Sequence, residues 1–273
     1  MSRLKLFFLT LLVLQVSGCT SPATRMNEQA STLGYQRQIV RGDGFDHVAY
    51  LNRKPALGNA APNNAVLHVY LEGDGTPWLR NNLAASDPTP RKPMMLNLMA
   101  QDTQPSLYLG RPCYHGFSHV IGCTPDLWTT ARYSEKVVAS MAAALGEMAA
   151  NYQHIILLGY SGGGSLAMLL AERLPQTKAV VTLAANLDTA AWAALHEDQL
   201  SQSLNPATRP PLPAHIKQMH YAGGEDDNVP PDLIRNAIAR QPKPGFKVFE
   251  KFDHRCCWQD AWHEVLGWLA RAK

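Results

Sequence analysis

Short apolar runs alternate with segments of helical periodicity along most of the chain. The runs are rich in Val, Ile and Leu and show little alternation of polar and apolar positions, which is typical of strands buried on both faces of a parallel sheet. After a hairpin-like start at 38–51, they lie at 65–71, 106–109, 154–158, 179–183, 216–221 and 246–252.

Four intervening segments have the spacing of apolar positions that is typical of amphipathic helices. In 134–150 the apolar side chains fall on one face, and Ser134 stands where it can cap the helix. The others are 164–174, 231–240 and 258–270. Strands that alternate with helices predict a mostly parallel sheet flanked by helices on both faces. We therefore expect a single α/β domain over 36–273, with a small cap formed by the insertion 186–213 between two strands.

The first residues have the pattern of a cleaved leader. Arg3 and Lys5 precede an apolar run from Leu6 to Leu14, which is shorter than the ~20 residues that span a bilayer. We interpret 1–18 as a signal peptide. Residues 19–35 are mostly small or polar and show no periodicity, so we expect a tether between the leader and the domain.

The segment Val16-Ser17-Gly18-Cys19 resembles the bacterial lipobox, in which small residues precede a cysteine that is lipidated and becomes the new N-terminus. The resemblance implies an anchor at Cys19, because two or more acyl chains hold a soluble body stably on a membrane. Thr20 and Ser21 follow, without the Asp that favours inner-membrane retention in many such lipoproteins. We expect a location in the bacterial cell envelope, on the outer membrane facing the periplasm. An ordinary secretory signal is the alternative interpretation.

The composition is that of a folded globular protein. Hydrophobic residues make up 46% of the chain and charged residues 17%, which excludes intrinsic disorder, collagen and coiled coil. The formal charge of +3 falls to +1 once Arg3 and Lys5 are removed with the leader. Proteins that bind nucleic acids carry a basic face, so we expect no nucleic-acid partner.

A serine stands between the apolar run 154–158 and the helix predicted from Gly164, within Gly159-Tyr160-Ser161-Gly162-Gly163. On a sharp strand-to-helix turn a serine has a strained backbone, and its neighbours two residues away must be small because the chain segments nearly touch. The helix N-terminus there favours a developing negative charge. A phosphate-binding loop is the alternative, but no Lys-Ser or Lys-Thr pair follows and G-x-G-x-x-G is absent. Ser161 is therefore the predicted nucleophile.

This motif and the order of elements resemble the α/β-hydrolase superfamily of serine hydrolases over about residues 36–273. A serine hydroxyl becomes reactive when a histidine takes its proton and a carboxylate orients that histidine. The resemblance implies the chain order Ser, Asp, His. Residues 222–230 are similar to the family's G-x-x-D-x-x-V-P loop and imply Asp226 as the acid, with Asp227 as the alternative. His254, between the last strand and the terminal helix, is implied as the base.

The same resemblance implies an oxyanion hole of two backbone N–H groups. One belongs to Gly162, directly after the nucleophile. The other belongs to Asp74 in Glu72-Gly73-Asp74, which resembles the family's His-Gly-x segment with Glu in place of His. Carboxylates that faced an oxyanion would repel it, so we expect both acidic side chains to point away or to be hydrogen-bonded to the surrounding loop.

The predicted mature domain has four cysteines: Cys113, Cys123, Cys256 and Cys257. In an exported protein an even number indicates two disulfides. Cross-links between the two loops are favoured because they avoid a strained bond between adjacent cysteines, and pairing within each loop is the alternative. His115 and His119 stand between the first two cysteines and invite a zinc interpretation. The exported context and the lack of a C-x-x-C pair argue against it, and we expect no metal.

The sequence thus predicts a membrane-anchored serine hydrolase that cleaves a carboxylic ester through an acyl-enzyme intermediate. Its substrate would be a small-molecule ester or acyl compound, and the chemistry needs no cofactor. A peptidase or amidase with the same three residues is one alternative, because the two chemistries differ chiefly in protonation of the leaving group. A non-catalytic envelope protein that uses this fold as a binding module is another.

Overall fold

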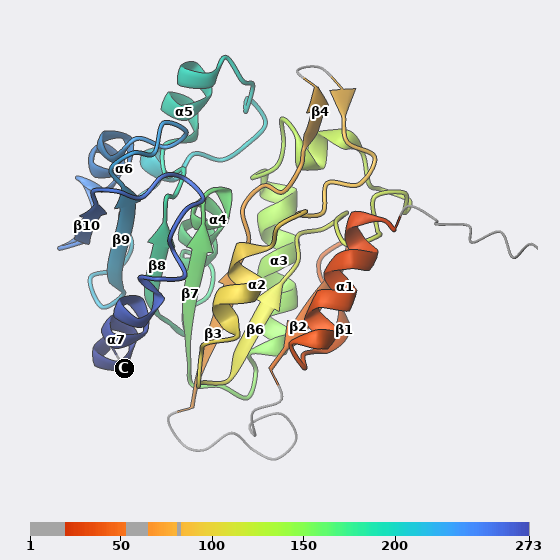
Figure 1. Cartoon of the computed structure of the whole chain (residues 1–273), viewed down its shortest axis with the longest axis horizontal. Coiled ribbons are helices and arrows are strands. Elements are labelled where there is room, and N and C mark those ends of the chain that lie inside the picture. Colours follow the sequence, from red (N-terminus) through yellow and green to blue (C-terminus); the bar gives the residue numbers. More distant parts are fainter. Residues whose placement is uncertain (1–19, 53–64, 81–82, 273) are drawn as a thin grey trace, which may run out of the picture.

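The computed structural model describes residues 20–52, 65–80 and 83–272 (Figure 1). The predicted signal peptide and the predicted lipidation site Cys19 lie outside these residues. Within the described ranges, no helix combines the length and the apolar character that a membrane crossing requires.

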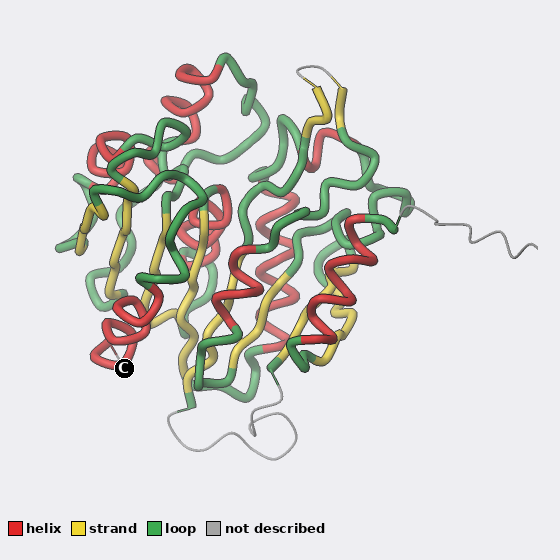
Figure 2. The backbone as a smooth tube through the Cα atoms, viewed as in Figure 1, coloured by secondary structure: helices red, strands yellow, loops and turns green. Residues whose placement is uncertain are grey.

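A sheet of eight strands forms the centre of the molecule (Figure 2). In spatial order the strands are β1 (Gln36–Arg41), β2 (Asp46–Leu51), β6 (Ser106–Leu109), β3 (Val66–Leu71), β7 (His154–Tyr160), β8 (Thr177–Leu183), β9 (Lys217–Gly223) and β10 (Gly245–Phe249). β2 pairs antiparallel with both β1 and β6, and the other pairs are parallel. The turn between β1 and β2 therefore lies at the same edge of the sheet as the carboxyl ends of the parallel strands.

Helices cover both faces of the sheet, and each face has its own apolar core. One face holds α1 (Pro22–Thr32), α2 (Met94–Met99) and α7 (Trp262–Ala272), and the other holds α3 (Glu135–Met148), α4 (Gly162–Ala171) and α6 (Pro231–Ile238). Strand residues divide between the faces by alternation. In β7, for example, Leu157 joins the core under α3 and α4, whereas Ile156 and Leu158 join the opposite core.

This architecture confirms the predicted fold class. The predicted strands and helices are present with shifted ends, and the last helix begins at Trp262 where 258 was predicted. The predicted cap segment contains α5 (Thr189–His196) and a short 3-10 helix, η2 (Pro206–Thr208), between β8 and β9. Besides α1, four small elements of the described residues were not predicted: the helix α2, the ribbon β4 (Trp78–Arg80) and β5 (Leu83–Ala84), and the 3-10 helix η1 (Pro125–Trp128).

The prediction of a tether at 19–35 was wrong for most of its length. Residues 22–32 form α1, which begins with Ser21 as its cap. Ala23, Met26 and Ala30 are buried against the body of the domain. Their spacings of three and four residues are those of one helix face, and this signal is weak because all the other positions are polar or small.

The favoured cross-links between cysteine loops were also wrong. Cys113 is bonded to Cys123, with a Cα–Cα distance of 5.5 Å, and Cys256 is bonded to Cys257. The first loop follows β6 and the second follows β10, which lies five strands away in the sheet. The turns of the first loop bring Cys113 and Cys123 within the Cα–Cα distance of less than about 7 Å that a disulfide requires. Each loop therefore pairs its own two cysteines.

The packing of α1 generates a prediction about stability. Met26 is only 1% exposed, so Met26→Ala should lower the free energy of unfolding by about 2–5 kcal/mol through the lost burial and the cavity left behind. Urea unfolding followed by circular dichroism measures the change. Glu28→Ala, on the exposed side of the same helix, is the control and should stay within about 0.5 kcal/mol of the parent chain. Equal stability of the two variants would instead support a tether.

Candidate active site

Ser161 stands on the sharp turn between the end of β7 and the start of α4. Its backbone has φ 52° and ψ −125°, a conformation that a non-glycine residue adopts only where the surrounding structure imposes it. The Ser161 N–H donates to the carbonyl of Leu183 at 2.9 Å, and its own carbonyl accepts from the N–H of Gly164 at 2.9 Å. These bonds hold the serine at the carboxyl edge of the sheet in the strained turn that the sequence predicts.

The glycines around Ser161 are required by close approaches of the backbone. A Cβ at Gly159 would lie 2.3 Å from the carbonyl oxygen of Gly163, and a Cβ at Gly163 would lie 2.2 Å from that of Leu71 in β3. Carbon and oxygen cannot approach so closely without a shift of the main chain. The turn therefore packs directly against the end of the neighbouring strand, and only glycine fits at these positions.

His254 lies between Ser161 and Asp226. Its Nε2 is 3.1 Å from Ser161 Oγ, and its Nδ1 is 2.9 Å from Asp226 Oδ2. Asp226 is buried, and its other carboxylate oxygen accepts two backbone N–H groups of its own loop at 3.0 and 2.8 Å. Asp227 is exposed. Of the two candidate acids, the structure thus places Asp226 beside the histidine.

Three further side chains, which the sequence analysis did not single out as partners of the histidine, contact His254. Asn228 Nδ2 lies 3.0 Å from the histidine Nε2, so it competes with Ser161 for the same lone pair. The carbonyl of His254 accepts from the Tyr160 hydroxyl at 3.0 Å and from Trp258 Nε1 at 3.1 Å. Together these contacts fix both the ring and the main chain of the histidine loop.

The loop Glu72–Asp74 lies directly against the nucleophile turn. A Cβ at Gly162 would lie 1.9 Å from Asp74 Oδ1, and a Cβ at Gly73 would lie 3.4 Å from Ser161 Cβ. Gly162 is the first residue of α4, where N–H groups have no acceptor within the helix. Among the described residues, no acceptor takes the N–H of Asp74 either. Both N–H groups predicted for the oxyanion hole are thus available to a ligand.

The Asp74 carboxylate is held by three donors from other parts of the chain. It lies 2.8 Å from Arg111 Nη2 and 3.0 Å from Arg132 Nη1, and the Tyr133 hydroxyl donates to it at 2.6 Å. Burial alone would raise the pKa of Asp74, but the two guanidinium groups and Tyr133 lower it by more, so the net shift is downward. The carboxylate of Asp74 is therefore ionised, and the positive charges of Arg111 and Arg132 compensate its negative charge.

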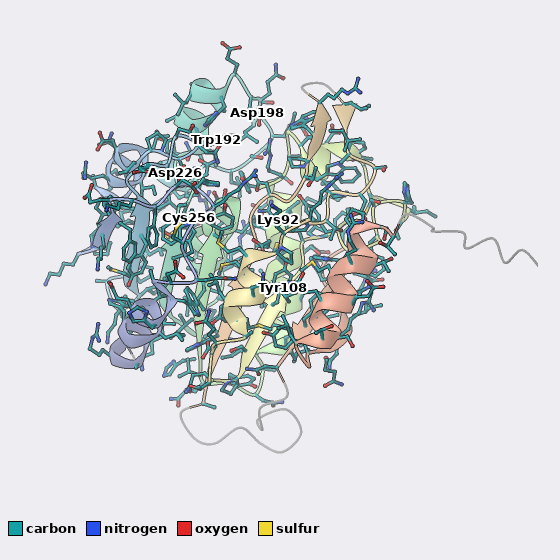
Figure 3. The ribbon with its side chains drawn as sticks, viewed as in Figure 1. Lys92, Tyr108, Trp192, Asp198, Asp226 and Cys256 are labelled. Carbon is teal, nitrogen blue, oxygen red and sulfur yellow. A yellow bond between two sulfur atoms is a disulfide. The ribbon has the colours of Figure 1, made fainter. Side chains whose placement is uncertain are left out.

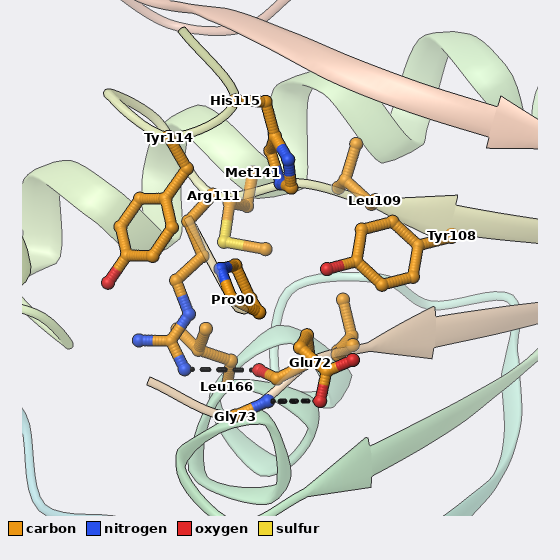
Figure 4. A pocket seen from close by; sticks show the side chains of 11 residues that line it. Glu72, Gly73, Pro90, Tyr108, Leu109, Arg111, Tyr114, His115, Met141 and Leu166 are labelled. Atoms are coloured by element: carbon orange, nitrogen blue, oxygen red, sulfur yellow. Dashed lines mark hydrogen bonds between the residues drawn. The ribbon is translucent and has the colours of Figure 1, made fainter. Parts of the chain in front are cut away.

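Glu72, in the same loop, is buried, and Figure 4 shows it near Gly73 and Arg111 among the residues that line a pocket. Its carboxylate accepts from the N–H groups of Gly73 at 3.1 Å and Met95 at 2.9 Å, and its carbonyl accepts from Arg111 Nη2 at 3.2 Å. Burial raises the pKa of Glu72 to about 7 against the smaller, opposite effect of these hydrogen bonds and of Arg111. Both acidic side chains are hydrogen-bonded, as predicted. Glu72 has a partner in its own loop, whereas the partners of Asp74 come from other parts of the chain.

The cap segment is attached to both loops of the site. Arg132 pairs through Nη2 with Asp198 at 2.6 Å, which links the cap to the loop of Asp74. From α5, Trp192 Nε1 donates to the carbonyl of Asn228 at 3.0 Å, and His196 Nε2 lies 2.7 Å from the same oxygen. Figure 3 shows Trp192, Asp198 and Asp226 together near the carboxyl edge of the sheet. No sequence pattern indicates these long-range contacts.

Solved structures share this architecture at low sequence identity. An esterase of Pyrococcus furiosus superposes with a TM-score of 0.59 and 11% identity, over 89% of this chain and 93% of its own. This chain has the α/β-hydrolase fold.

Two longer proteins are also similar over part of their length. An acylaminoacyl peptidase of Pyrococcus horikoshii (TM-score 0.59, 12% identity) and a puromycin hydrolase (TM-score 0.62, 16% identity) each match 87% of the chain. The matched region spans only 41% and 39% of the lengths of those two proteins. No family model and no curated protein matches the sequence.

The segment considered for zinc does not assemble a metal site on this α/β-hydrolase fold. Cys113 and Cys123 are bonded to each other, and His115 is buried while His119 is exposed. Burial lowers the pKa of His115 to about 3. Across the part of the chain that the structure describes, no three His, Cys, Asp or Glu side chains are grouped to hold a metal ion.

Glu72 generates a prediction about pH. Its pKa is 4.5 without burial and about 7 in the folded chain, so between these values the folded state binds more protons and stability falls as pH rises. The parent chain should lose roughly 2–3 kcal/mol more than Glu72→Gln between about pH 5 and 8. Urea unfolding of both proteins at the two pH values measures the difference. The same pH dependence in both would contradict this account of Glu72.

Tyr133→Phe tests the support of the Asp74 loop. A hydrogen bond to a charged group contributes about 1.5–3 kcal/mol, so stability should fall by that amount. Because the oxyanion hole acts mainly in the transition state, kcat on an ester should fall about tenfold while KM changes less than about twofold. Tyr152→Phe is the control, since the buried Tyr152 hydroxyl has no hydrogen-bond partner among the described residues. If both variants keep full kcat, Tyr133 does not support the oxyanion hole.

Proposed function

We propose that this chain is a serine hydrolase that cleaves carboxylic esters. The observation that carries the proposal is the continuous contact from Ser161 Oγ through His254 to Asp226, at 3.1 Å and 2.9 Å, at the end of a strained strand-to-helix turn. Strained backbone at a reactive side chain is a recurrent feature of functional sites.

In the proposed reaction, Ser161 Oγ attacks the ester carbonyl while His254 Nε2 takes the hydroxyl proton. Asp226 orients the imidazole through Nδ1 and stabilises the imidazolium that forms. The N–H groups of Gly162 and Asp74 bind the negative oxygen of the tetrahedral intermediate. His254 then returns the proton to the leaving alkoxide. Water, deprotonated by the same imidazole, hydrolyses the acyl-enzyme and restores the serine hydroxyl. The chemistry needs no cofactor.

We favour an ester as the substrate class because the lengths of the similar proteins differ. The esterase among the similar structures is covered over 93% of its length, whereas the acylaminoacyl peptidase and the puromycin hydrolase are more than twice as long as the matched region. Amide hydrolysis by the same residues makes a stronger demand on His254, which must protonate a leaving amine. We therefore propose small-molecule esters or acyl compounds as substrates.

We further propose that the protein is anchored to the membrane through a lipidated Cys19. The support is the lipobox-like Val16-Ser17-Gly18-Cys19 after a short apolar leader. The proposed location is the bacterial cell envelope, on the outer membrane with the domain in the periplasm. Acyl chains on a single N-terminal cysteine are sufficient for stable attachment when two or more are present.

A fluorophosphonate probe tests the catalytic proposal. The parent chain should become covalently labelled, and Ser161→Ala should abolish labelling and lower ester hydrolysis by about 10⁴-fold or more. The native circular dichroism spectrum of Ser161→Ala is the control for folding. A folded parent chain that is neither labelled nor active would identify a non-catalytic binding protein.

The substrate class is decided by a screen of nitrophenyl esters of graded chain length beside aminopeptide amides. Turnover of esters with little or no amide turnover is the expected result. Clear amide turnover without ester turnover would replace the esterase proposal by a peptidase or amidase, with the same residues acting.

A further inference from the structure

The loop closed by the Cys113–Cys123 disulfide ends in an exposed apolar tip. Ile121 is 100% exposed and Val120 is 50% exposed. Single apolar side chains on a surface are common. A fully exposed isoleucine in a loop that a disulfide holds in place, however, leaves its apolar surface in water unless a partner covers it. The surroundings of this tip indicate the nature of that partner.

The described chain is fixed as far as its first residue. Ser21 Oγ accepts the N–H of Thr24 at 3.0 Å, and Arg25 donates to the carbonyl of Thr20 at 2.7 Å. Both bonds tie Thr20 and Ser21 to α1, which is packed on the domain through Met26. Cys19 directly precedes Thr20 in the chain. This step rests on the lipid anchor of the proposed function, which then places the bilayer next to the start of α1.

The disulfide loop packs beside that start. A Cβ at Gly116 would lie 3.8 Å from the Cβ of Ala23, in the first turn of α1. Phe117 packs against the same apolar core as Met26. Val120 and Ile121 follow within four residues, so the apolar tip lies at the end of α1 from which the anchor would leave.

This end of the molecule also carries the candidate active site. The loop reaches the turn between β1 and β2, where a Cβ at Gly122 would lie 3.9 Å from Phe45. Because β2 is antiparallel to β6, this turn is at the carboxyl edge of the sheet, where Ser161 also lies. The β4–β5 ribbon stands at the same edge (Figure 1), and its Leu79 and Leu83 are 48% and 57% exposed.

We propose that Val120 and Ile121 insert into the membrane that holds the lipid anchor and turn the carboxyl edge of the sheet toward the bilayer. The anchor and the apolar tip are then two contacts on one side of the domain, which together define its orientation. The substrates that reach Ser161 most readily in this orientation are amphiphilic esters presented at the lipid surface.

Tryptophan substitution tests the contact in the full, lipidated chain. Ile121→Trp and Leu33→Trp are reconstituted into vesicles of phosphatidylethanolamine and phosphatidylglycerol, with and without brominated acyl chains. Leu33 is the control because it is exposed at the other end of α1, about 16 Å along the helix. Relative to the parent chain, the added fluorescence of Ile121→Trp should be quenched by brominated lipid and that of Leu33→Trp should not. Absent quenching at 121, or equal quenching at both positions, overturns the proposal.

A second arm measures function. Val120→Asp/Ile121→Asp should hydrolyse a long-chain ester embedded in the vesicles about tenfold more slowly, since transfer of even one such apolar side chain from water changes an equilibrium by that order. Hydrolysis of a dissolved short-chain ester should not change, and Ile39→Asp, on the exposed side of β1, should resemble the parent chain in both assays. Unchanged turnover of the embedded ester by the double variant overturns the proposal.

The two arms separate this inference from the proposed function. A parent chain that hydrolyses no dissolved ester refutes the esterase, while the quenching still decides whether the tip contacts lipid. A parent chain that carries no acyl group and does not bind the vesicles refutes both the anchor and the inference. Dimerisation through Ile121 in place of quenching would assign the tip to a second copy of the chain and overturn the membrane contact.

Discussion

The site depends on one constraint, the strained turn that carries Ser161 between β7 and α4. A strained residue of this kind costs about 1–3 kcal/mol and persists only where its surroundings over-determine it. Here the surroundings are the two parallel neighbours of β7: Leu183 of β8 bonds the serine N–H, and the end of β3 leaves no room for a side chain at Gly163. The same parallel sheet brings the ends of β3, β7 and β9 to one edge. The loop Glu72–Asp74, the turn of Ser161 and the loop of Asp226 therefore meet there although they are far apart in the sequence.

Glu72 and Asp74 lie beside the predicted oxyanion hole, where a negative side chain would repel a negative oxygen, and the structure removes this repulsion in two ways. Asp74 keeps its charge and is neutralised by Arg111 and Arg132, with Arg132 itself shared with Asp198 of the cap. Glu72 is instead buried so thoroughly that its pKa rises to about 7, so near neutral pH much of its charge is absent. Breaking a buried ion pair costs about 3–5 kcal/mol, so the Arg132–Asp198 pair couples the position of the cap to that of the loop Glu72–Asp74.

The parts of the molecule that sequence reasoning predicts well are those determined locally. Buried parallel strands are visible as apolar runs. The G-x-S-x-G segment identifies Ser161 as the residue on the turn, because the turn excludes other residues at the glycine positions. The errors come from weak or distant signals. The helix α1 has only three apolar side chains on its buried face, so its sequence resembles a linker. The cysteine pairing depends on how each loop folds back on itself. The contacts of Asn228 and Arg132 with the site depend on tertiary packing, which the spacing of residues along the chain does not indicate.

In the proposed reaction, the N–H groups of Gly162 and Asp74 and the imidazole of His254 surround the reacting centre bonded to Ser161 Oγ. A crystal structure of the chain after reaction with a phosphonate ester tests this arrangement. We expect phosphorus bonded to Ser161 Oγ, with the phosphoryl oxygen about 2.7–3.1 Å from both N–H groups and His254 within hydrogen-bond distance of the serine oxygen. Phosphorus on another residue, or a phosphoryl oxygen that turns away from both N–H groups, would contradict it.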